Sequence, residues 1–191
     1  MTTGLRELLT RVTGLLDASH IPFMVAGSVA STAHGIPRTT QAIDIVIDPP
    51  GHREFRALID SMVPESYYVD HDAAREALLQ GSMFNAIDLQ TGWKVDFILR
   101  KDRPFSREEF ERRQPLLLLE VPVFVASPED TVVSKLEWSV KAGGSERQRG
   151  DIAGVLEATR QTLDYEYIQK WVTRLDLTGE WETVRSRIQS K

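Results

Sequence analysis

The fold of this chain is decided by Gly27-Ser28 and, after nine intervening residues, by Arg38-Thr39-Thr40-Gln41-Ala42-Ile43-Asp44-Ile45-Val46-Ile47-Asp48. β-Branched residues surround Asp44, which predicts a strand that carries one carboxylate. Before Gly27, Phe23-Met24-Val25-Ala26 predicts a short buried strand, and the small residues after Ser28 predict a short helix packed on that strand. Strand, turn, helix and acidic strand in this order indicate an α/β arrangement.

The acidic strand is a candidate metal site. Side chains two apart on a strand point to one face, so positions 42 and 44 face the same site. Asp96 lies in a second predicted strand, 94–99, and is placed to add a carboxylate from a neighbouring strand. Magnesium prefers a few carboxylates together with substrate phosphates. The pattern indicates phosphoryl or nucleotidyl transfer; the alternative is that Asp96 is a structural acid.

Gly27 and Ser28 are candidate phosphate ligands. Glycine permits a close backbone approach, and a helix N-terminus with a serine hydroxyl is suited to a triphosphate. A lone Gly-Ser pair is a weak signal, but the pair followed by an acidic strand and a later strand aspartate is much more specific.

The rest of the chain divides into a mixed part and a helical part. We expect residues 1–126 to form an α/β core and residues 127–191 a helical region packed on it. The core adds a hairpin turn at Thr91-Gly92 and a short helix with Ser106 and Glu109 as a capping box. The predicted helices are 5–16, 29–33, 55–62, 73–80, 128–141, 146–160, 165–175 and 181–188, and the other predicted strands are 83–89, 116–119 and 121–125.

Composition narrows the function further. The chain has 191 residues, no cysteine and a net charge of −5, which excludes cysteine metal sites and disfavours bulk nucleic-acid binding. No apolar run is long enough to span a membrane, and the first residues lack a signal-peptide pattern, so we expect a cytoplasmic protein. Basic residues do cluster locally, at 100–113 and 135–149, as either a nucleotide- or RNA-binding face or a solvated helix surface.

The motif resembles that of polymerase-beta-like nucleotidyltransferases, Gly-Ser followed by Asp-x-Asp. The form with Arg-x-Thr before the acidic pair, here Arg38 and Thr40, is similar to the AbiEii-like toxins of toxin–antitoxin systems. Asp130 with Lys135 resembles that family's Asp-x(n)-Lys helix. Arg147-Gln148-Arg149-Gly150-Asp151 resembles its closing motif, so the matches run from about residue 22 to 156.

The resemblance implies a small mixed sheet flanked by helices, with a C-terminal helical region. It implies transfer of a nucleoside monophosphate from a nucleoside triphosphate to an acceptor hydroxyl, with Mg²⁺ (or Mn²⁺) held by Asp44 and Asp96. Asp96 would also help to deprotonate the acceptor. The implied nucleotide-binding residues are Gly27, Ser28, Arg38, Thr40, Asp130 and Lys135, and Asp151 is implicated in activity. RNA, including the tRNA 3′ end, is the implied acceptor, with an antitoxin protein as partner.

The departure from the family pattern lies at Ala42, where that pattern has an aspartate. An alanine cannot bind a metal, so transfer should be impaired by orders of magnitude or lost. Ala42 is either an introduced replacement or a natural loss, and the intact surroundings favour the first. Two other functions stay open: a non-catalytic nucleotide- or partner-binding protein, and an aminoglycoside-type enzyme that modifies small molecules.

Three of the implied site residues have structural alternatives. Ser127-Pro128-Glu129-Asp130 is a good helix start, so Asp130 is equally explained by capping. Lys135 lies among apolar residues of that helix and could extend its ammonium to solvent. Asp151 could pair with Arg147 one helical turn away.

Overall fold

The computed structural model describes residues 2–35 and 39–189, and backbone contacts divide the chain into two compact units. The sheet unit comprises Met1–Ala26 and Thr40–Val125, and the helical unit comprises Gly27–Thr39 and Ala126–Lys191. The division into domains 1–126 and 127–191 stays a prediction. The contact-based units differ from it in one respect, because residues 27–39 group with the helical residues.

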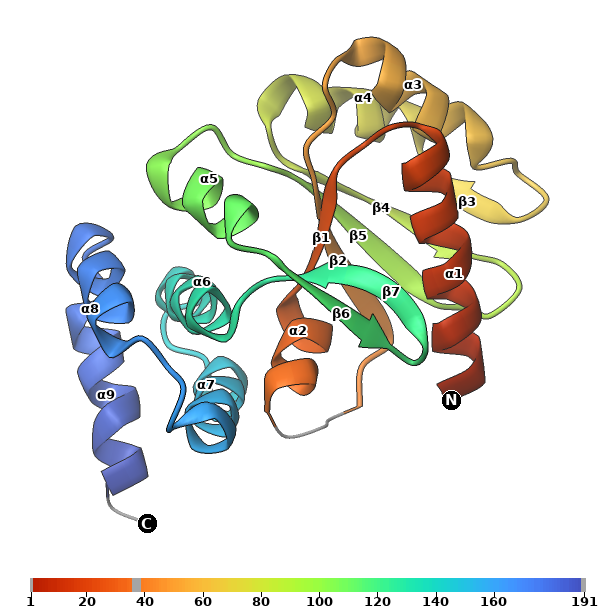
Figure 1. Cartoon of the computed structure of the whole chain (residues 1–191). Coiled ribbons are helices and arrows are strands. Elements are labelled where there is room, and N and C mark those ends of the chain that lie inside the picture. Colours follow the sequence, from red (N-terminus) through yellow and green to blue (C-terminus); the bar gives the residue numbers. More distant parts are fainter. Residues whose placement is uncertain (1, 36–38, 190–191) are drawn as a thin grey trace. The chain divides into compact units, whose positions relative to one another are not determined.

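The sheet unit contains a seven-stranded mixed sheet in the order β3-β4-β5-β2-β1-β7-β6 (Figure 1). The pairs β2–β5 and β1–β7 are parallel and the other four are antiparallel. This confirms the predicted mixed α/β fold. The elements are α1 (Thr2–Ala18), β1 (Phe23–Ala26), β2 (Ala42–Ile47), α3 (His52–Ser61), β3 (Tyr67–Val69), α4 (His71–Gln80), β4 (Met83–Asp88), β5 (Lys94–Leu99), α5 (Pro104–Glu111), β6 (Gln114–Leu118) and β7 (Val121–Val125).

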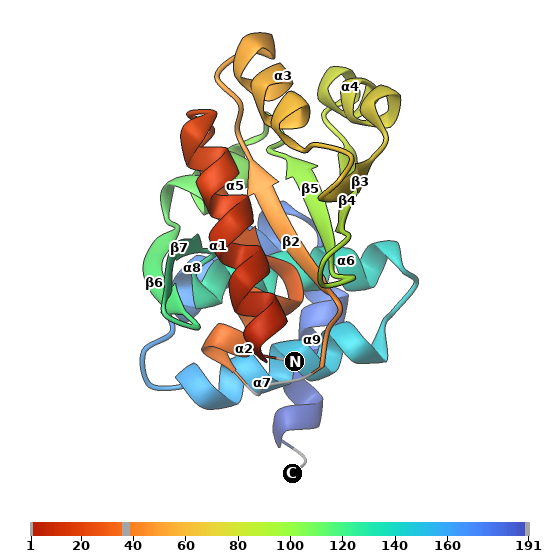
Figure 2. The same cartoon turned by 90° about the vertical axis from the view of Figure 1, so that its right-hand side faces the viewer.

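One face of the sheet is buried and the other is more open. Along β2, Ile43, Ile45 and Ile47 are fully buried, whereas the alternate residues, including Asp44, are only half-buried. Burying each isoleucine contributes roughly 1.5–3 kcal/mol, so a one-residue slip of register would be strongly unfavourable. Figure 2 shows α1 running along the sheet, with α3 and α4 beside each other at one end of it. The register therefore keeps Asp44 on the open face.

The helical unit contains α2 (Gly27–His34), α6 (Pro128–Lys141), α7 (Glu146–Thr159), α8 (Tyr165–Arg174) and α9 (Thr178–Gln189). Helices α2 and α7 pack closely near Gly35. A Cβ on that glycine would lie 2.9 Å from the Ser31 carbonyl oxygen and 2.9 Å from the Val155 amide nitrogen, so glycine is required there. No helix in the described ranges has both the length and the apolarity needed to cross a membrane.

Two local predictions need correction. The capping box at Ser106 is wrong: helix α5 begins earlier, with Arg103 as N-cap and Pro104 at its first position, and Ser106 accepts a hydrogen bond from Arg103 Nε instead. Strand β3 was also missed, because its three residues are too few to show a periodic pattern and it forms only by pairing with β4. The expected hairpin is confirmed, with β4 and β5 antiparallel and Gly92 at a φ of 70°.

Candidate functional site

The two aspartates of the acidic motif meet in the sheet unit. In the parallel ladder of β2 and β5, Asp44 and Asp96 are register partners. Neighbouring strands lie about 4.8 Å apart and the side chains of register partners share a face, so both carboxylates lie on the same face of the sheet. Asp44 is half-buried and Asp96 is 7% exposed. A third polar residue, Asn85 of β4, is the register partner of Asp96 on its other side and is exposed.

A lysine lies in the same array. Lys94 is the register partner of Ala42, two residues before Asp96, and therefore shares the face of both aspartates. Its Nζ lies 3.0 Å from Asp96 Oδ2, with the lysine side chain 45% and the aspartate side chain 9% exposed. The other oxygen, Asp96 Oδ1, is buried with no hydrogen-bond partner in the described part of the chain. Together, Ala42, Asp44, Lys94 and Asp96 are called the carboxylate face.

The carboxylate face does not fit a centre for two divalent ions. Ala42 provides no ligand, and Asp96 is already paired with an ammonium group. Among residues 2–35 and 39–189, no group of three or more histidine, aspartate or glutamate side chains is arranged to hold a metal. Magnesium requires several oxygen ligands in near-octahedral geometry, and two carboxylates opposed by a lysine do not supply them.

The residues that flank the acidic motif have local partners. Thr40 Oγ1 lies 3.1 Å from the Ala42 carbonyl oxygen, so Thr40 fixes the start of β2. Asp48, just beyond β2, pairs with Arg100 at 2.8 Å between Oδ2 and Nε. Arg38, which the family resemblance includes in the nucleotide site, lies outside the described residues.

The Gly-Ser motif begins helix α2, as the sequence predicted. Gly27 has a φ of +59°, a left-handed conformation that glycine adopts without steric cost. Ser28 is 8% exposed, and its carbonyl oxygen accepts a hydrogen bond from the Ser31 hydroxyl. Ala26, the residue before Gly27, is the register partner of Asp44. Strand β1, which pairs with the acidic strand β2, therefore continues directly into the start of α2.

Lys135 and Asp151, two predicted site residues, form a buried ion pair in the helical unit. Lys135 Nζ lies 2.7 Å from Asp151 Oδ2 and 3.1 Å from Gln148 Oε1, and the side chains of the ion pair are 5% and 8% exposed. The sequence indicated neither this pairing nor the role of Gln148, because these residues come from two helices, α6 and α7. A signal was present in principle, since a lysine among apolar helix residues needs a partner when buried.

Asp130 is fully buried at the start of α6. Ser127 is the N-cap of this helix: its hydroxyl accepts a hydrogen bond from the Asp130 amide and donates one to Asp130 Oδ2, at 2.6 Å. The Tyr167 hydroxyl donates a further hydrogen bond to Asp130 Oδ1, at 2.5 Å. This geometry supports the structural role that the helix-start pattern offered, and a role of Asp130 in nucleotide binding stays a prediction.

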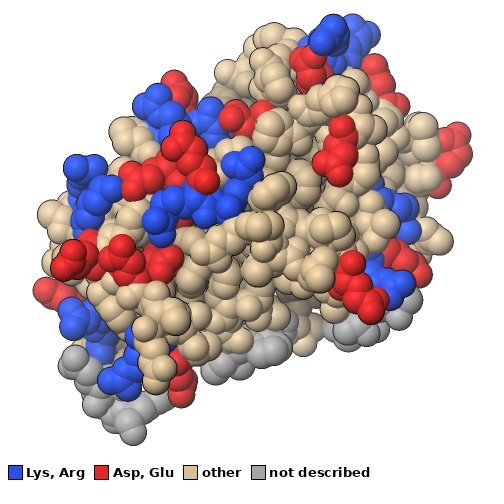
Figure 3. Space-filling view, viewed as in Figure 1, with Lys and Arg blue, Asp and Glu red and all other residues tan. Residues whose placement is uncertain are grey.

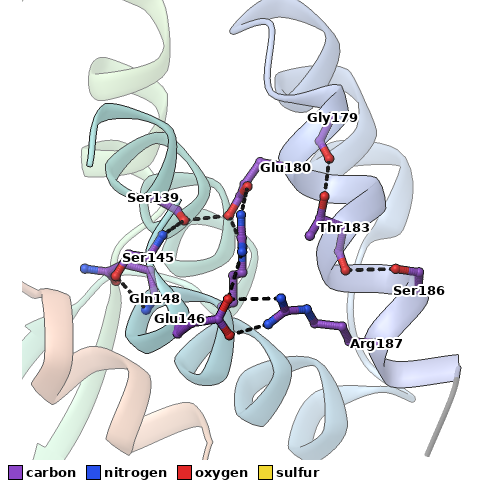
Figure 4. A network of polar contacts seen from close by, with 10 residues as sticks. Ser139, Ser145, Glu146, Gln148, Gly179, Glu180, Thr183, Ser186 and Arg187 are labelled. Atoms are coloured by element: carbon purple, nitrogen blue, oxygen red, sulfur yellow. Dashed lines mark hydrogen bonds and ion pairs between the residues drawn. The ribbon is translucent and has the colours of Figure 1, made fainter. Parts of the chain in front are cut away.

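Sequence reasoning did not foresee a second charged cluster, which joins α7 to α9 (Figure 4). Arg149 donates from Nε and Nη2 to the two carboxylate oxygens of Glu180, at 2.7 and 2.8 Å. Glu146 accepts hydrogen bonds from Arg187 and Arg149, which lower its pKa to about 2. The pKa of Glu180 is also lowered, above all by the hydrogen bonds from Arg149. Ser139 adds a hydroxyl hydrogen bond to Glu180, at 2.5 Å.

This charged cluster borders a cavity of about 870 Å³ in the helical unit. Its apolar wall includes Leu156, Trp181 and Val184. Its charged lining residues are Glu146, Arg149, Glu157, Arg160, Arg185 and Arg187. Arginine therefore outnumbers glutamate around this cavity.

The basic stretch 100–113 is largely engaged by neighbours. Arg107 pairs with Asp102, and the Arg113 guanidinium stacks over the rings of Phe110 and Phe124. On the face drawn in Figure 3, acidic and basic side chains are intermixed, and no extended patch of one sign covers it.

No protein-family model and no curated protein sequence matches the chain. Several solved structures do. The antibiotic-resistance factor ANT(2'')-Ia matches with a TM-score of 0.58 and 12% identity over 100% of both chains. A nucleotidyltransferase-like protein from Paracoccidioides brasiliensis matches with 0.53 and 17% over 97% of this chain and 94% of that one. The lincosamide adenylyltransferase LnuA matches with 0.52 and 13% over 77% and 93%.

This chain has a nucleotidyltransferase fold. The likeness extends over nearly the whole of both chains in two of the three cases, so it covers the helical unit as well as the sheet unit. Identities of 12–17% establish the fold alone, and function has to be argued from the site.

Proposed function

We propose that this chain binds a nucleoside triphosphate at a nucleotidyltransferase-type site. With Ala42 in place, it transfers the nucleoside monophosphate very slowly or not at all. The observation that carries the proposal is the register of Asp44 and Asp96, because it sets two carboxylates on the same face of two parallel strands. Nucleotidyl transfer needs such a pair to hold positive charge against the phosphates. Ala42 and the Lys94–Asp96 pair support the loss of catalytic power.

The proposal assigns the phosphates to the start of α2. The Gly27 backbone and the Ser28 hydroxyl provide the helix N-terminus, with Arg38, Thr40, Asp130 and Lys135 as the further nucleotide residues that the family resemblance implies. Asp151 contributes by holding Lys135, to which it is bonded. In this assignment Ser28 is the residue whose loss weakens nucleotide binding most directly.

The reaction proposed for the restored Ala42→Asp form is a single displacement. The oxygen of an acceptor hydroxyl forms a bond to the α-phosphorus, the bond from that phosphorus to the bridging oxygen breaks, and pyrophosphate leaves with the electron pair. The hydroxyl proton passes to a base, a role that the proposal gives to Asp96. Bound Mg²⁺ or Mn²⁺ would supply the charge compensation that Ala42 removes.

The acceptor is proposed to be RNA, including the tRNA 3′ end, with an antitoxin as protein partner; the basis is the similarity of the Arg-x-Thr motif to AbiEii-like toxins. Small molecules are the second candidate. One matched structure, that of ANT(2'')-Ia, is a complex with adenylyl-2''-tobramycin, and LnuA was solved with lincomycin bound. A polycationic aminoglycoside calls for an acidic pocket at the acceptor site, whereas an RNA acceptor calls for a basic rim.

The test is transfer from α-labelled nucleoside triphosphates with Mg²⁺ or Mn²⁺, using total RNA in one series and an aminoglycoside and lincosamide panel in another. The forms compared are the chain as written, Ala42→Asp, and Ala42→Asp with Lys94→Gln. We expect labelled RNA only from forms with Asp at position 42, with a gain of about 100-fold or more over the chain as written.

Two controls make this result specific. Ala73→Asp adds the same charge at an exposed position of α4 and should produce no transfer. Asp96→Asn in the Ala42→Asp background should abolish the gain. Label on an antibiotic alone would replace RNA by the small-molecule acceptor. Nucleotide binding without transfer in any form would support the non-catalytic alternative, and the absence of both would overturn the proposal.

A further inference from the structure

Position 94 carries a positive charge beside Ala42, the position at which the family resemblance implies an aspartate. Lys94 and Ala42 are register partners, so the lysine side chain stands beside the alanine methyl group on the same face of the sheet. An aspartate at position 42 would be larger by a carboxyl group and would lie next to this ammonium. The residues at 42 and 94 therefore have to be considered together.

The Lys94–Asp96 ion pair differs from an ordinary surface ion pair because its carboxylate is buried. The Asp96 side chain is only 9% exposed, and burying a carboxylate is unfavourable unless a donor or a cation compensates its charge. Lys94 Nζ, 3.0 Å from Oδ2, provides that compensation, while buried Oδ1 lacks a hydrogen-bond partner in the described part of the chain. The carboxylate is thus neutralised on one side and retains acceptor capacity on the other.

We propose that Lys94 is a resident cation of the carboxylate face, whose ammonium group neutralises Asp96 and keeps the affinity of this face for divalent metal low. This inference rests on the proposed function, because it treats the carboxylate face as the metal side of a nucleotidyltransferase-type site. An ammonium and a divalent ion compete for the same carboxylates, and two cations a few ångströms apart repel each other. Lys94 is 45% exposed, so its removal leaves no buried cavity.

The pairing has a consequence for restoring the site. In the Ala42→Asp form, the new carboxylate lies in register with Lys94 and is itself neutralised by that lysine. Ala42→Asp alone should therefore recover only part of the metal affinity. The double variant Ala42→Asp/Lys94→Gln should recover more than the sum of the two single changes.

The test is a titration of the full chain with Mn²⁺ in the absence of nucleotide. The electron paramagnetic resonance signal of the free ion measures how much Mn²⁺ is bound. We expect weak binding by the chain as written and an affinity at least about tenfold higher for Lys94→Gln. Lys94→Arg keeps the positive charge and should show no gain. Lys94→Gln/Asp96→Asn should lose the gain, which locates the bound ion at the carboxylate face.

The matched control is Lys141→Gln in α6. The Lys141 side chain is also 45% exposed and its Nζ also lies 3.0 Å from a carboxylate oxygen, that of Glu137, so the same charge is removed from an equivalent pair. Equal Mn²⁺ affinities of Lys94→Gln and Lys141→Gln, or a gain in Lys94→Arg, would overturn the inference. Circular dichroism confirms that each variant is folded. The Mn²⁺ titration contains no nucleotide, so it tests this inference separately from the proposed function. If Lys94→Gln gains Mn²⁺ affinity but no variant binds a nucleoside triphosphate, the inference holds and the proposed function is refuted.

Discussion

Two lysine–aspartate pairs in this chain have the same chemistry and different surroundings. Lys94 and Asp96 lie two residues apart on one strand, and the lysine is half exposed. Lys135 and Asp151 come from two helices and are almost completely buried. An exposed ammonium exchanges its partner for water or a ligand at little cost, whereas a buried ion pair cannot lose one member without leaving an uncompensated charge. The first pair is therefore suited to regulating a site, and the second to holding two helices together.

The largest effect is expected from breaking the buried pair. Lys135→Met leaves the Asp151 carboxylate without its cation, and the free energy of unfolding should fall by about 3–5 kcal/mol. Urea unfolding at neutral pH measures the change, with Lys141→Met on the same helix as control. The double variant Lys135→Met/Asp151→Leu should regain much of the loss. A small effect of Lys135→Met would remove the contrast between the two pairs.

A smaller effect is expected from the charged cluster between α7 and α9. Glu180→Gln weakens the two hydrogen bonds from Arg149 and should lower the free energy of unfolding by about 1.5–3 kcal/mol at neutral pH. The folded pKa values of Glu180 and Glu146 are lowered relative to an unfolded value near 4.3. Their stabilising contribution is complete above that value and is lost as the pH falls through the folded pKa, about 2 for Glu146.

Urea unfolding of the chain and of Glu180→Gln across this acidic range checks that expectation. The stability difference between the two should shrink as the pH falls below about 4.3, because the folded pKa of Glu180 is lowered by its hydrogen bonds from Arg149. Glu182→Gln, an exposed glutamate of the same helix, is the control and should have little effect at any pH. A Glu180→Gln difference that stays constant with pH would show that the loss comes from packing and not from charge.

The smallest effect is expected for the Lys94–Asp96 pair, in which only the lysine is half exposed. Lys94→Gln should lower the free energy of unfolding by about 1 kcal/mol, because the glutamine amide still offers Asp96 a hydrogen-bond donor and water can reach the lysine position. The same urea titration measures it. A loss as large as that of Lys135→Met would make Lys94 a structural residue and would weaken its assignment as a resident cation.

Most of the fold could be predicted from the sequence, because its elements carry strong local signals. The acidic strand, the Gly-Ser helix start and the helix start at Ser127-Pro128 all follow from residue type and spacing, and the structure has each where the pattern indicated. The exceptions are instructive. Strand β3 depends on its partner β4, and the start of α5 was predicted from Ser106 although Pro104 decides it.

The candidate site was less accessible to sequence reasoning. Asp44 and Asp96 could be named from their strands, but the sequence did not show that they are register partners. That depends on the strand order, in which β2 lies next to β5 although β3 and β4 come between them in the sequence. The role of Lys94 depends on the same ladder. The partners of Lys135 and Asp130 depend on which helices pack together, and no spacing along the chain encodes that.

The sequence by itself determined most of the helices and strands and the presence of Ala42, Asp44 and Asp96 in predicted strands, because these properties are local. The tertiary structure decided which charges meet. Strand register set Lys94 beside Ala42 and Asp96, and helix packing buried Lys135 against Asp151. The physical reason is that an ion pair depends on distance and burial, and both are fixed only when segments distant in sequence pack together.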